Sequence, residues 1–393
     1  MNIQKTPKNN IFLNLNDNKS IEELIKKLSN EGSNDSLIDL LNCIIHLREK
    51  NYQDAIKKCT LSLSKGVFNF EVLIKVFSEI YKIKSNTDFE NFLKCFNPFF
   101  TYLIKNQQFL NNLDKILSAI GFRKDNSEKK LMIIGEFFVA PLIKQSFKTN
   151  FFELALRLEN IYYNTLVTGI ETNEAFDFGM SLIKQPGTKA GIDFNKMLQL
   201  EKNKTSNSDV PKVGFFIHNA SMLAHIGNIF SFLKYNQNRI NKSFSPIIFC
   251  FSGNDDVFHR AFSEIGVQIE YLHLDKKGQI INNYIDRFVA LKRKCHNINL
   301  SKMVWVCLAI HMPFAFGMKL AQEQIWWSQK WTKLKLSTID KYIYSGSFAL
   351  NEFRDGNNWK TGWIQRESWL DSVNENEVNN IKNLFNGKLI LGS

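Results

Sequence analysis

The feature that most limits the fold of this chain is a change in its hydrophobic pattern near residue 210. Before it, apolar residues recur at intervals of three and four, as in amphipathic helices. After it, short apolar runs such as 213–218, 245–251 and 303–310 alternate with helical stretches. Strands that alternate with helices form a parallel sheet with right-handed crossovers. We therefore expect an α + α/β protein, with an all-α N-terminal domain followed by a Rossmann-like parallel α/β domain.

The helical pattern is expected over residues 20–200, after a polar, disordered lead-in at 1–19. In one stretch, Tyr52 begins a helix and Ala55 follows three residues later, where a small side chain lets paired helices approach closely. This spacing is typical of a tetratricopeptide-type (TPR-like) hairpin. The pattern does not recur cleanly at about 34 residues, so a plain helical bundle is an equally good interpretation.

The boundary between the two domains is expected at residues 201–212, a polar stretch that contains Pro211 near its end. Polar, proline-bearing stretches are typical of linkers. The Rossmann-like domain then covers residues 213–372.

Composition excludes several classes of protein. Lys and Arg outnumber Asp and Glu by 50 to 38, but the lysines are spread along the chain without a block of like charges, so we expect no nucleic-acid partner. The six cysteines form no C-x-x-C pair, which argues against a disulfide framework or a zinc site. The polar N-terminus lacks the apolar core of a signal peptide, and no apolar run approaches the ~20 residues that span a bilayer. We expect a cytoplasmic protein without a transmembrane segment.

Polar side chains follow the first strand of the α/β part. His218, Asn219 and Ser221 stand where a dinucleotide-binding domain has its glycine-rich turn. Such a turn suits the binding of hydroxyl groups better than the binding of phosphate. The alternative is that these residues only cap or pack. His311 follows the strand at 304–310 in the same way, and ligands bind at this edge of open α/β sheets.

His225 falls near the start of the next helix, where the helix dipole disfavours a cationic imidazole. A neutral imidazole can act as a base or as a hydrogen-bond acceptor. The histidines show none of the usual short metal-ligand spacings, so we expect no metal site. The chain also lacks a Walker A motif, a G-x-S-x-G turn and an H-E-x-x-H helix.

Two segments resemble a known family. Gly214 and, two residues beyond strict spacing, His225 match a turn of the form G-x-x-S-x-D-F-x-x-H. A later segment, R-x-A-P-I-Q-x-x-W, followed by D-Y-I, is matched by Lys319, Ala321, Gln324, Trp327, Asp340, Tyr342 and Ile343. This resembles the O-GlcNAc transferase and Spindly family of inverting glycosyltransferases, which have two Rossmann domains (the GT-B type). Gln322, Glu323 and residues 328–330 depart from the motif, so sugar and acceptor specificity do not carry over.

The resemblance implies a function and a set of roles. His225 takes a catalytic or acceptor-positioning role, and Gln324 and Trp327 help to shape the cleft. The donor is a nucleotide-sugar (a UDP- or GDP-sugar) and the acceptor is a protein or a glycan. Residues 373–393 stand where the second, donor-binding Rossmann domain begins, so we expect this chain to be truncated, to bind no cofactor itself and to be inactive alone.

A rival hypothesis is a non-catalytic module in which the helical repeat and the α/β domain bind a protein or a carbohydrate without turnover.

Overall fold

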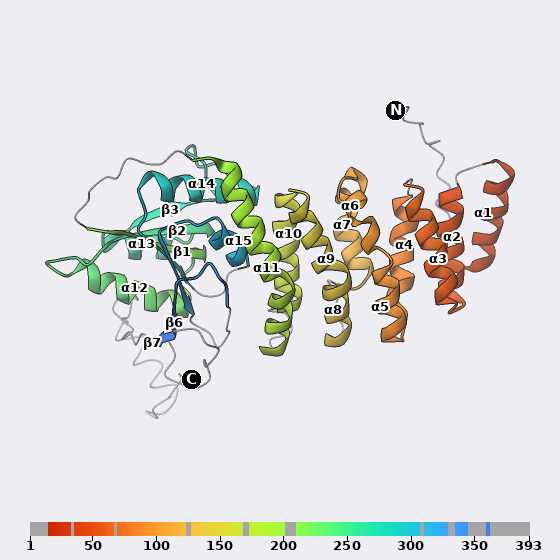
Figure 1. The fold of residues 1–393 in the computed structure, drawn as a ribbon, viewed down its shortest axis with the longest axis horizontal. Helices are drawn as coiled ribbons and strands as arrows, with labels where there is room; N and C mark the ends of the chain where they lie inside the picture. The colour runs from red at the N-terminus through yellow and green to blue at the C-terminus, as the bar shows by residue number, and fades with distance from the viewer. Residues whose placement is uncertain are drawn as a thin grey trace, which may run out of the picture. The chain divides into compact units, whose positions relative to one another are not determined.

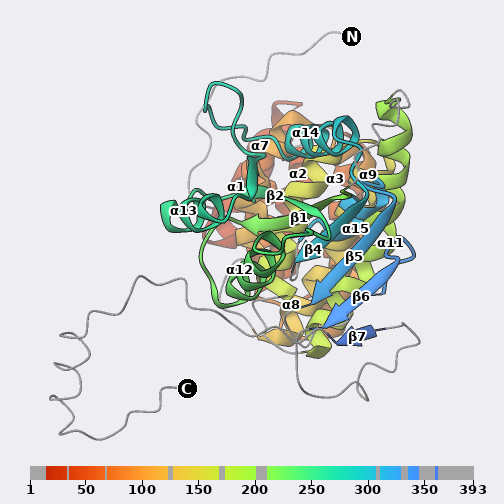
Figure 2. The same ribbon diagram turned by 90° about the vertical axis from the view of Figure 1, so that its left-hand side faces the viewer.

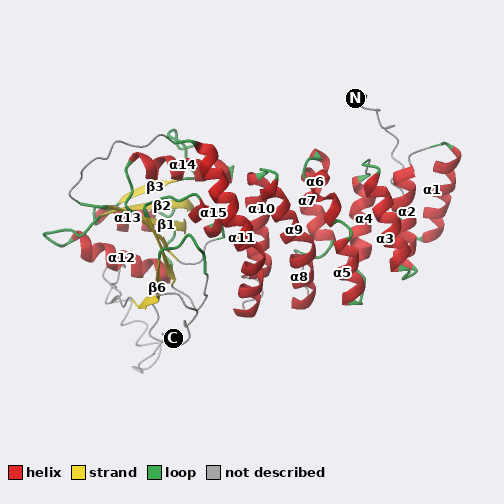
Figure 3. Cartoon of the chain, in the orientation of Figure 1, coloured by secondary structure: helices red, strands yellow, loops and turns green. Residues whose placement is uncertain are grey.

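The computed structural model describes residues 15–32, 35–66, 69–122, 127–167, 173–200, 210–306, 310–328, 335–344 and 359–361. The chain forms two compact units, Met1–Phe194 and Asn195–Ser393. The first contains helices, and the second contains a parallel sheet with helices, so the expected α + α/β class is confirmed (Figure 1, Figure 3).

Helices of the first unit follow one another in chain order (Figure 1), as in a helical-repeat stack. They are α1 (Asn18–Asn30), α2 (Asp35–Arg48), α3 (Tyr52–Ser64), α4 (Phe70–Tyr81), α5 (Asn86–Lys94), the 3-10 turn η1 (Asn97–Phe99), α6 (Phe100–Leu103), α7 (Gln107–Ala119), α8 (Glu128–Ile134), the π-turn η2 (Gly135–Val139), α9 (Ala140–Lys148), α10 (Phe152–Tyr162), the π-turn η3 (Tyr163–Val167) and α11 (Asn173–Leu198), which runs into the second unit.

Polar caps explain where several of these helices begin. The Asp17 carboxylate accepts a hydrogen bond from the Ser20 amide at 2.8 Å, so α1 begins at Asn18, before the expected start at residue 20. Asn51, Asn69 and Asn106 cap α3, α4 and α7 in the same way. Each such cap stabilises its helix by about 1 kcal/mol, because it satisfies an amide that has no partner within the helix.

Phenylalanine rings fill the core of the first unit. Phe77 stacks on Phe96 with 4.8 Å between ring centroids, and Phe138 meets Phe77 and Phe100 edge-on at 5.4 Å each. Aromatic pairs of this kind add about 0.5–1.5 kcal/mol beyond their burial. The core therefore joins helices that are distant in sequence.

The second unit contains a seven-stranded sheet in which every pair is parallel, in the order β3-β2-β1-β4-β5-β6-β7. Its strands are β1 (Lys212–Asn219), β2 (Ser245–Ser252), β3 (Gln268–Tyr271), β4 (Lys302–Val306), β5 (Glu323–Ser328), β6 (Lys341–Tyr344) and β7 (Trp359–Thr361). The chain moves outward from β1 to β3 and then returns to place β4 on the other side of β1. This reversal creates a topological switch point at the carboxyl ends of β1 and β4.

Helices cover both faces of the sheet (Figure 2). On one face, α12 (Ala224–Gln237) and α13 (Asp256–Glu264) share a core with Phe215, Ile248 and Trp327. On the other, α14 (Tyr284–Asn297) and α15 (Met312–Gly317) contribute Phe288 and Phe316 to aromatic contacts with the strands. The strands read as nearly continuous apolar runs because both faces are buried.

Trp305 of β4 is fully buried and stacks on Phe216 of β1, with 3.8 Å between ring centroids and 5° between planes. All seven tryptophans of the chain are at or beyond Trp305, and so belong to the second unit.

Several expectations fall outside the described residues: most of the lead-in at 1–19, most of the linker at 201–212, and the start of a second Rossmann domain at 373–393. The limits of 20–200 and 213–372 therefore stay predictions. Among the described helices, none is long and apolar enough to cross a membrane.

Candidate functional site at the carboxyl edge of the sheet

The turns after β1 and β2 lock together at the carboxyl edge of the sheet. The Ser252 hydroxyl donates to the His218 carbonyl at 2.6 Å, and the Ala220 amide donates to the Ser252 carbonyl at 2.8 Å. Gly253 has φ +80°, and a Cβ at this position would lie 2.0 Å from Asn219 Oδ1. Only glycine lets the two turns approach this closely.

His218 and His311 come together at the topological switch point. His218 is the penultimate residue of β1, and His311 stands at the N-cap position of α15, after β4. The Phe251 ring lies 5.6 Å from the His218 ring and 5.8 Å from the His311 ring, measured between centroids. Tyr284, the first residue of α14, lies 5.2 Å from His311. The structure therefore brings together two of the histidines that the sequence singled out, in an aromatic setting.

Arg287 of α14 is a member of this cluster that the sequence reasoning missed. Its guanidinium donates to the Ile281 carbonyl at 2.8 Å and to the Phe251 carbonyl at 3.2 Å, and it lies 5.3 Å from the Phe251 ring centroid. The sequence does indicate that Arg287 is buried, because it stands four residues before Leu291 on the apolar stripe of its helix. A charged residue on such a stripe is unusual.

Burial keeps both histidines neutral. Burial, with a smaller contribution from the Arg287 charge, lowers the pKa of His218 to about 4. Burial, then His218 and Arg287, hold the pKa of His311 well below its ordinary value. A neutral imidazole has one ring nitrogen that donates and one that accepts. At neutral pH this edge therefore combines an arginine with two uncharged imidazole rings.

Other residues of the β1 turn lie near the same edge. Asn219 ends β1 and is exposed, and Ser221 is partly exposed, with its amide donating to the Asn219 carbonyl. Asp255 caps α13 and also accepts from the Met222 amide at 3.3 Å, which ties the two turns together. The polar turn is therefore built from both strand ends.

His225 is the second residue of α12, in the first helical turn as the sequence predicted. No side chain caps this helix, since Leu223 precedes it. The His225 side chain lies outside the described part of the chain, so its catalytic role stays a prediction.

Gln324 and Trp327 do not join the histidines. Gln324 is buried near the amino end of β5, and its side-chain amide binds three backbone groups: it accepts from the Leu320 amide at 3.0 Å and donates to the carbonyls of Phe316 at 3.0 Å and Thr338 at 2.7 Å. Trp327 is buried against Phe232, edge-on at 5.5 Å. These contacts hold loops and core in place, and a role in substrate binding stays a prediction for both residues.

Metal ligation is not seen among the described residues, where no group of three or more His, Cys, Asp or Glu side chains is arranged to hold an ion.

Comparisons with known proteins add little. No family model and no curated protein sequence matches the chain. A solved structure of a mutant O-GlcNAc transferase from Thermobaculum terrenum aligns at 10% identity with a TM-score of 0.30, over 80% of this chain and 55% of that one. The chain thus spans about half the length of that enzyme, and a TM-score this low carries no argument.

Proposed function

We propose that this chain is the helical part and the acceptor-side α/β part of an inverting glycosyltransferase that uses a UDP- or GDP-sugar. The observation that carries the proposal is the meeting of His218 and His311 at the switch point of a parallel sheet. The turn there is rich in side chains and lacks the glycines that cradle a pyrophosphate. The match of Gly214 and His225 to the glycosyltransferase motif supports the same function.

In this proposal the residues of the edge act on the acceptor. His225 orients the acceptor hydroxyl or removes its proton as the oxygen attacks the anomeric carbon and the bond to the diphosphate breaks. His218, Asn219, Ser221 and His311 bind acceptor hydroxyls, and the partly exposed ring of Tyr284 packs against apolar faces of a sugar or peptide. Stabilisation of the leaving diphosphate falls to a second, donor-binding domain of the full-length protein.

The test is a transfer assay with the full-length protein. It is incubated with radiolabelled UDP- and GDP-sugars and a mixture of protein and glycan acceptors, and transfer and donor hydrolysis are both measured. His225→Ala is expected to lower transfer by about 100-fold or more, because general-base catalysis contributes about 10²–10⁴-fold. His259→Ala, a change at an exposed position on α13, serves as the matched control and should leave the rate unchanged.

The results separate the two hypotheses. Full activity in His225→Ala removes this residue from the mechanism. A full-length protein that binds protein or glycan but neither binds nor turns over any nucleotide-sugar is a binding module, and the enzymatic proposal is then wrong.

A further inference from the structure

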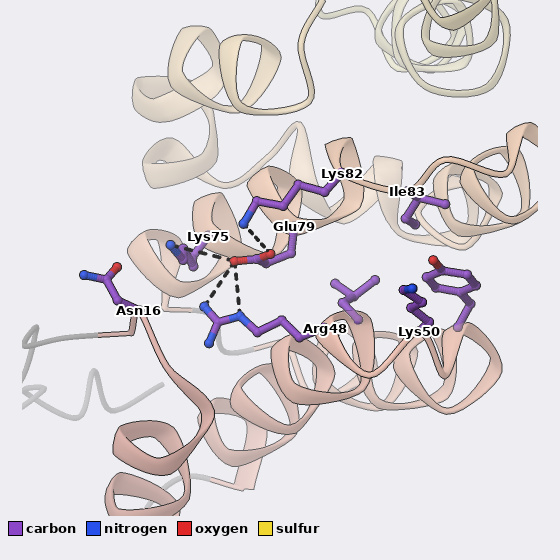
Figure 4. Close-up of a pocket in the computed structure, with 9 residues that line it drawn as sticks. Asn16, Arg48, Lys50, Lys75, Glu79, Lys82 and Ile83 are labelled. Carbon is purple, nitrogen blue, oxygen red and sulfur yellow. Dashed lines mark hydrogen bonds and ion pairs between the residues drawn. The ribbon is translucent and has the colours of Figure 1, made fainter.

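A pocket of about 440 Å³ lies within the helical unit, where the end of α2 meets the start of α3 and the last turns of α4 (Figure 4). Five charged side chains line it: Arg48, Lys50, Lys75, Lys82 and Glu79. Four positive charges against one negative leave an excess of three. The pocket therefore attracts anions.

Glu79 holds the cations around the pocket. Its carboxylate is buried at 5% exposure, and Arg48 binds Oε1 through Nε at 3.3 Å and Nη2 at 3.1 Å. Lys82 Nζ lies 2.7 Å from Oε2, and Lys75 Nζ lies 3.8 Å from Oε1 (Figure 4). Burial raises the pKa of Glu79, but hydrogen bonds from Lys82 and Arg48 outweigh it and leave the pKa below its ordinary value. The carboxylate is thus ionised at neutral pH.

Arg48 is already engaged by the protein. Beyond Glu79, it donates to the Asn18 side chain at 3.2 Å and to the Leu15 carbonyl at 2.5 Å. Lys75 and Lys82 are also paired with Glu79, but each lysine ammonium has three donors and can contact a ligand as well. The Lys82 side chain is 64% exposed, so most of its surface remains accessible.

Lys50 is held in place by its backbone. It adopts a left-handed conformation with φ 63°, its amide donates to the Leu47 carbonyl at 3.2 Å, and the Asn51 amide donates to the His46 carbonyl at 2.9 Å. This turn closes α2 and leads into the Asn51 cap of α3. The Lys50 side chain thus starts from a defined point at the edge of the pocket.

Leu47, Tyr52 and Ile83 form an apolar wall in the same pocket. A matching ligand combines several negative charges with an apolar group. The volume lies in the range of about 300–1,000 Å³ that is typical of organic ligands, and a single inorganic anion would leave most of it empty. Lysine ammonium groups bind phosphates as well as carboxylates, so the volume and the apolar wall, rather than the cations, favour a peptide over a free phosphate.

We propose that this pocket binds an acidic peptide segment, with its carboxylates on Lys50, Lys75 and Lys82 and an apolar side chain on the apolar wall. The site is independent of glycosyl transfer at the sheet edge, and either proposal can fail alone.

The test measures binding of a fluorescein-labelled hexapeptide that contains three glutamates and a leucine to the whole chain by fluorescence polarisation. Binding is expected to be saturable and to weaken with added salt, because exposed charges are screened. The triple variant Lys50→Gln, Lys75→Gln, Lys82→Gln should weaken it at least tenfold. A control triple, Lys57→Gln, Lys115→Gln, Lys129→Gln, removes the same charge from exposed positions of the helical unit and should change affinity less than twofold.

A second readout needs no variant. Bound peptide should protect the three pocket lysines, but not Lys57 or Lys115, from acetylation as followed by mass spectrometry. The proposal is wrong if the matched glutamine peptide binds equally well or if both triple variants weaken binding equally. It is also wrong if phosphate, UDP or a short RNA binds the pocket in preference to the acidic peptide.

Discussion

Single residues at this sheet illustrate two uses of a buried polar group. The side-chain amide of Gln324 forms hydrogen bonds with three backbone groups and thereby joins the segments before and after β5. His218 and His311 instead remain uncharged beside Arg287, in an aromatic cluster at the carboxyl edge of the sheet. Buried polar groups are expensive unless they are paired, so each must serve the fold or the site.

Replacing Gln324 with leucine is expected to lower the free energy of unfolding by about 2–3 kcal/mol, because it leaves buried backbone groups without their partners. Urea denaturation measures the change. Gln322→Leu, at a neighbouring exposed position, is the control and should shift it by less than about 0.5 kcal/mol. A Gln324→Leu protein of unchanged stability would show that the amide is not structural.

The depressed pKa of His218 predicts a loss of stability in mild acid. Unfolded histidine titrates near about 6.5, whereas folded His218 stays neutral to about 4. Between these values the unfolded chain binds more protons, so the free energy of unfolding falls as pH falls from about 6.5 to 4. His218→Gln should flatten this dependence by up to about 1 kcal/mol per pH unit, as measured by urea denaturation at several pH values. The exposed His259→Gln is the control, and equal slopes in the two variants would contradict the prediction.

At the scale of elements, the turns after β1 and β2 form a single hydrogen-bonded unit. The hydrogen bonds between Ser252, His218 and Ala220 align the two strand ends, and Asp255 caps α13 while holding the Met222 amide. His218 and Asn219 therefore stand at the end of β1 and Asp255 at the start of α13, and hydrogen bonds hold the turn that carries Ser221 between them. Precise sites generally need such support.

Gly253→Ala should lower the stability of the protein by more than the backbone strain at a positive φ alone explains. Gly253 and Gly278 have similar positive φ values, +80° and +77°, but an added Cβ clashes with Asn219 and Ala220 only at Gly253. We expect Gly253→Ala to cost about 1–2 kcal/mol more than Gly278→Ala in thermal or urea denaturation. Equal costs would mean that the two turns relax apart without penalty.

At the scale of the whole molecule, the alternation of apolar runs and helices predicted the α + α/β class, because that period depends only on which faces are buried. It also placed His218 and His311 at neighbouring strand ends, since strands in a parallel sheet end at one edge. The position of the Arg287 side chain at this edge could not be predicted from the apolar pattern. Arg287 reaches the edge from a crossover helix, and the rotation of that helix about its axis depends on packing. For the same reason the basic pocket was missed, since Lys50 and Lys82 are distant in sequence and meet through the stacking of α2 on α4.

The placement of every tryptophan in the second unit has a spectroscopic consequence. Indole emission therefore reports on the second unit, and burial of Trp305 against Phe216 shields that ring from water. Far-ultraviolet circular dichroism, by contrast, is dominated by the many helices of the first unit. Tryptophan emission thus follows the second unit, while circular dichroism follows mainly the first, and a denaturation experiment can compare the two halves in the same cuvette without any label.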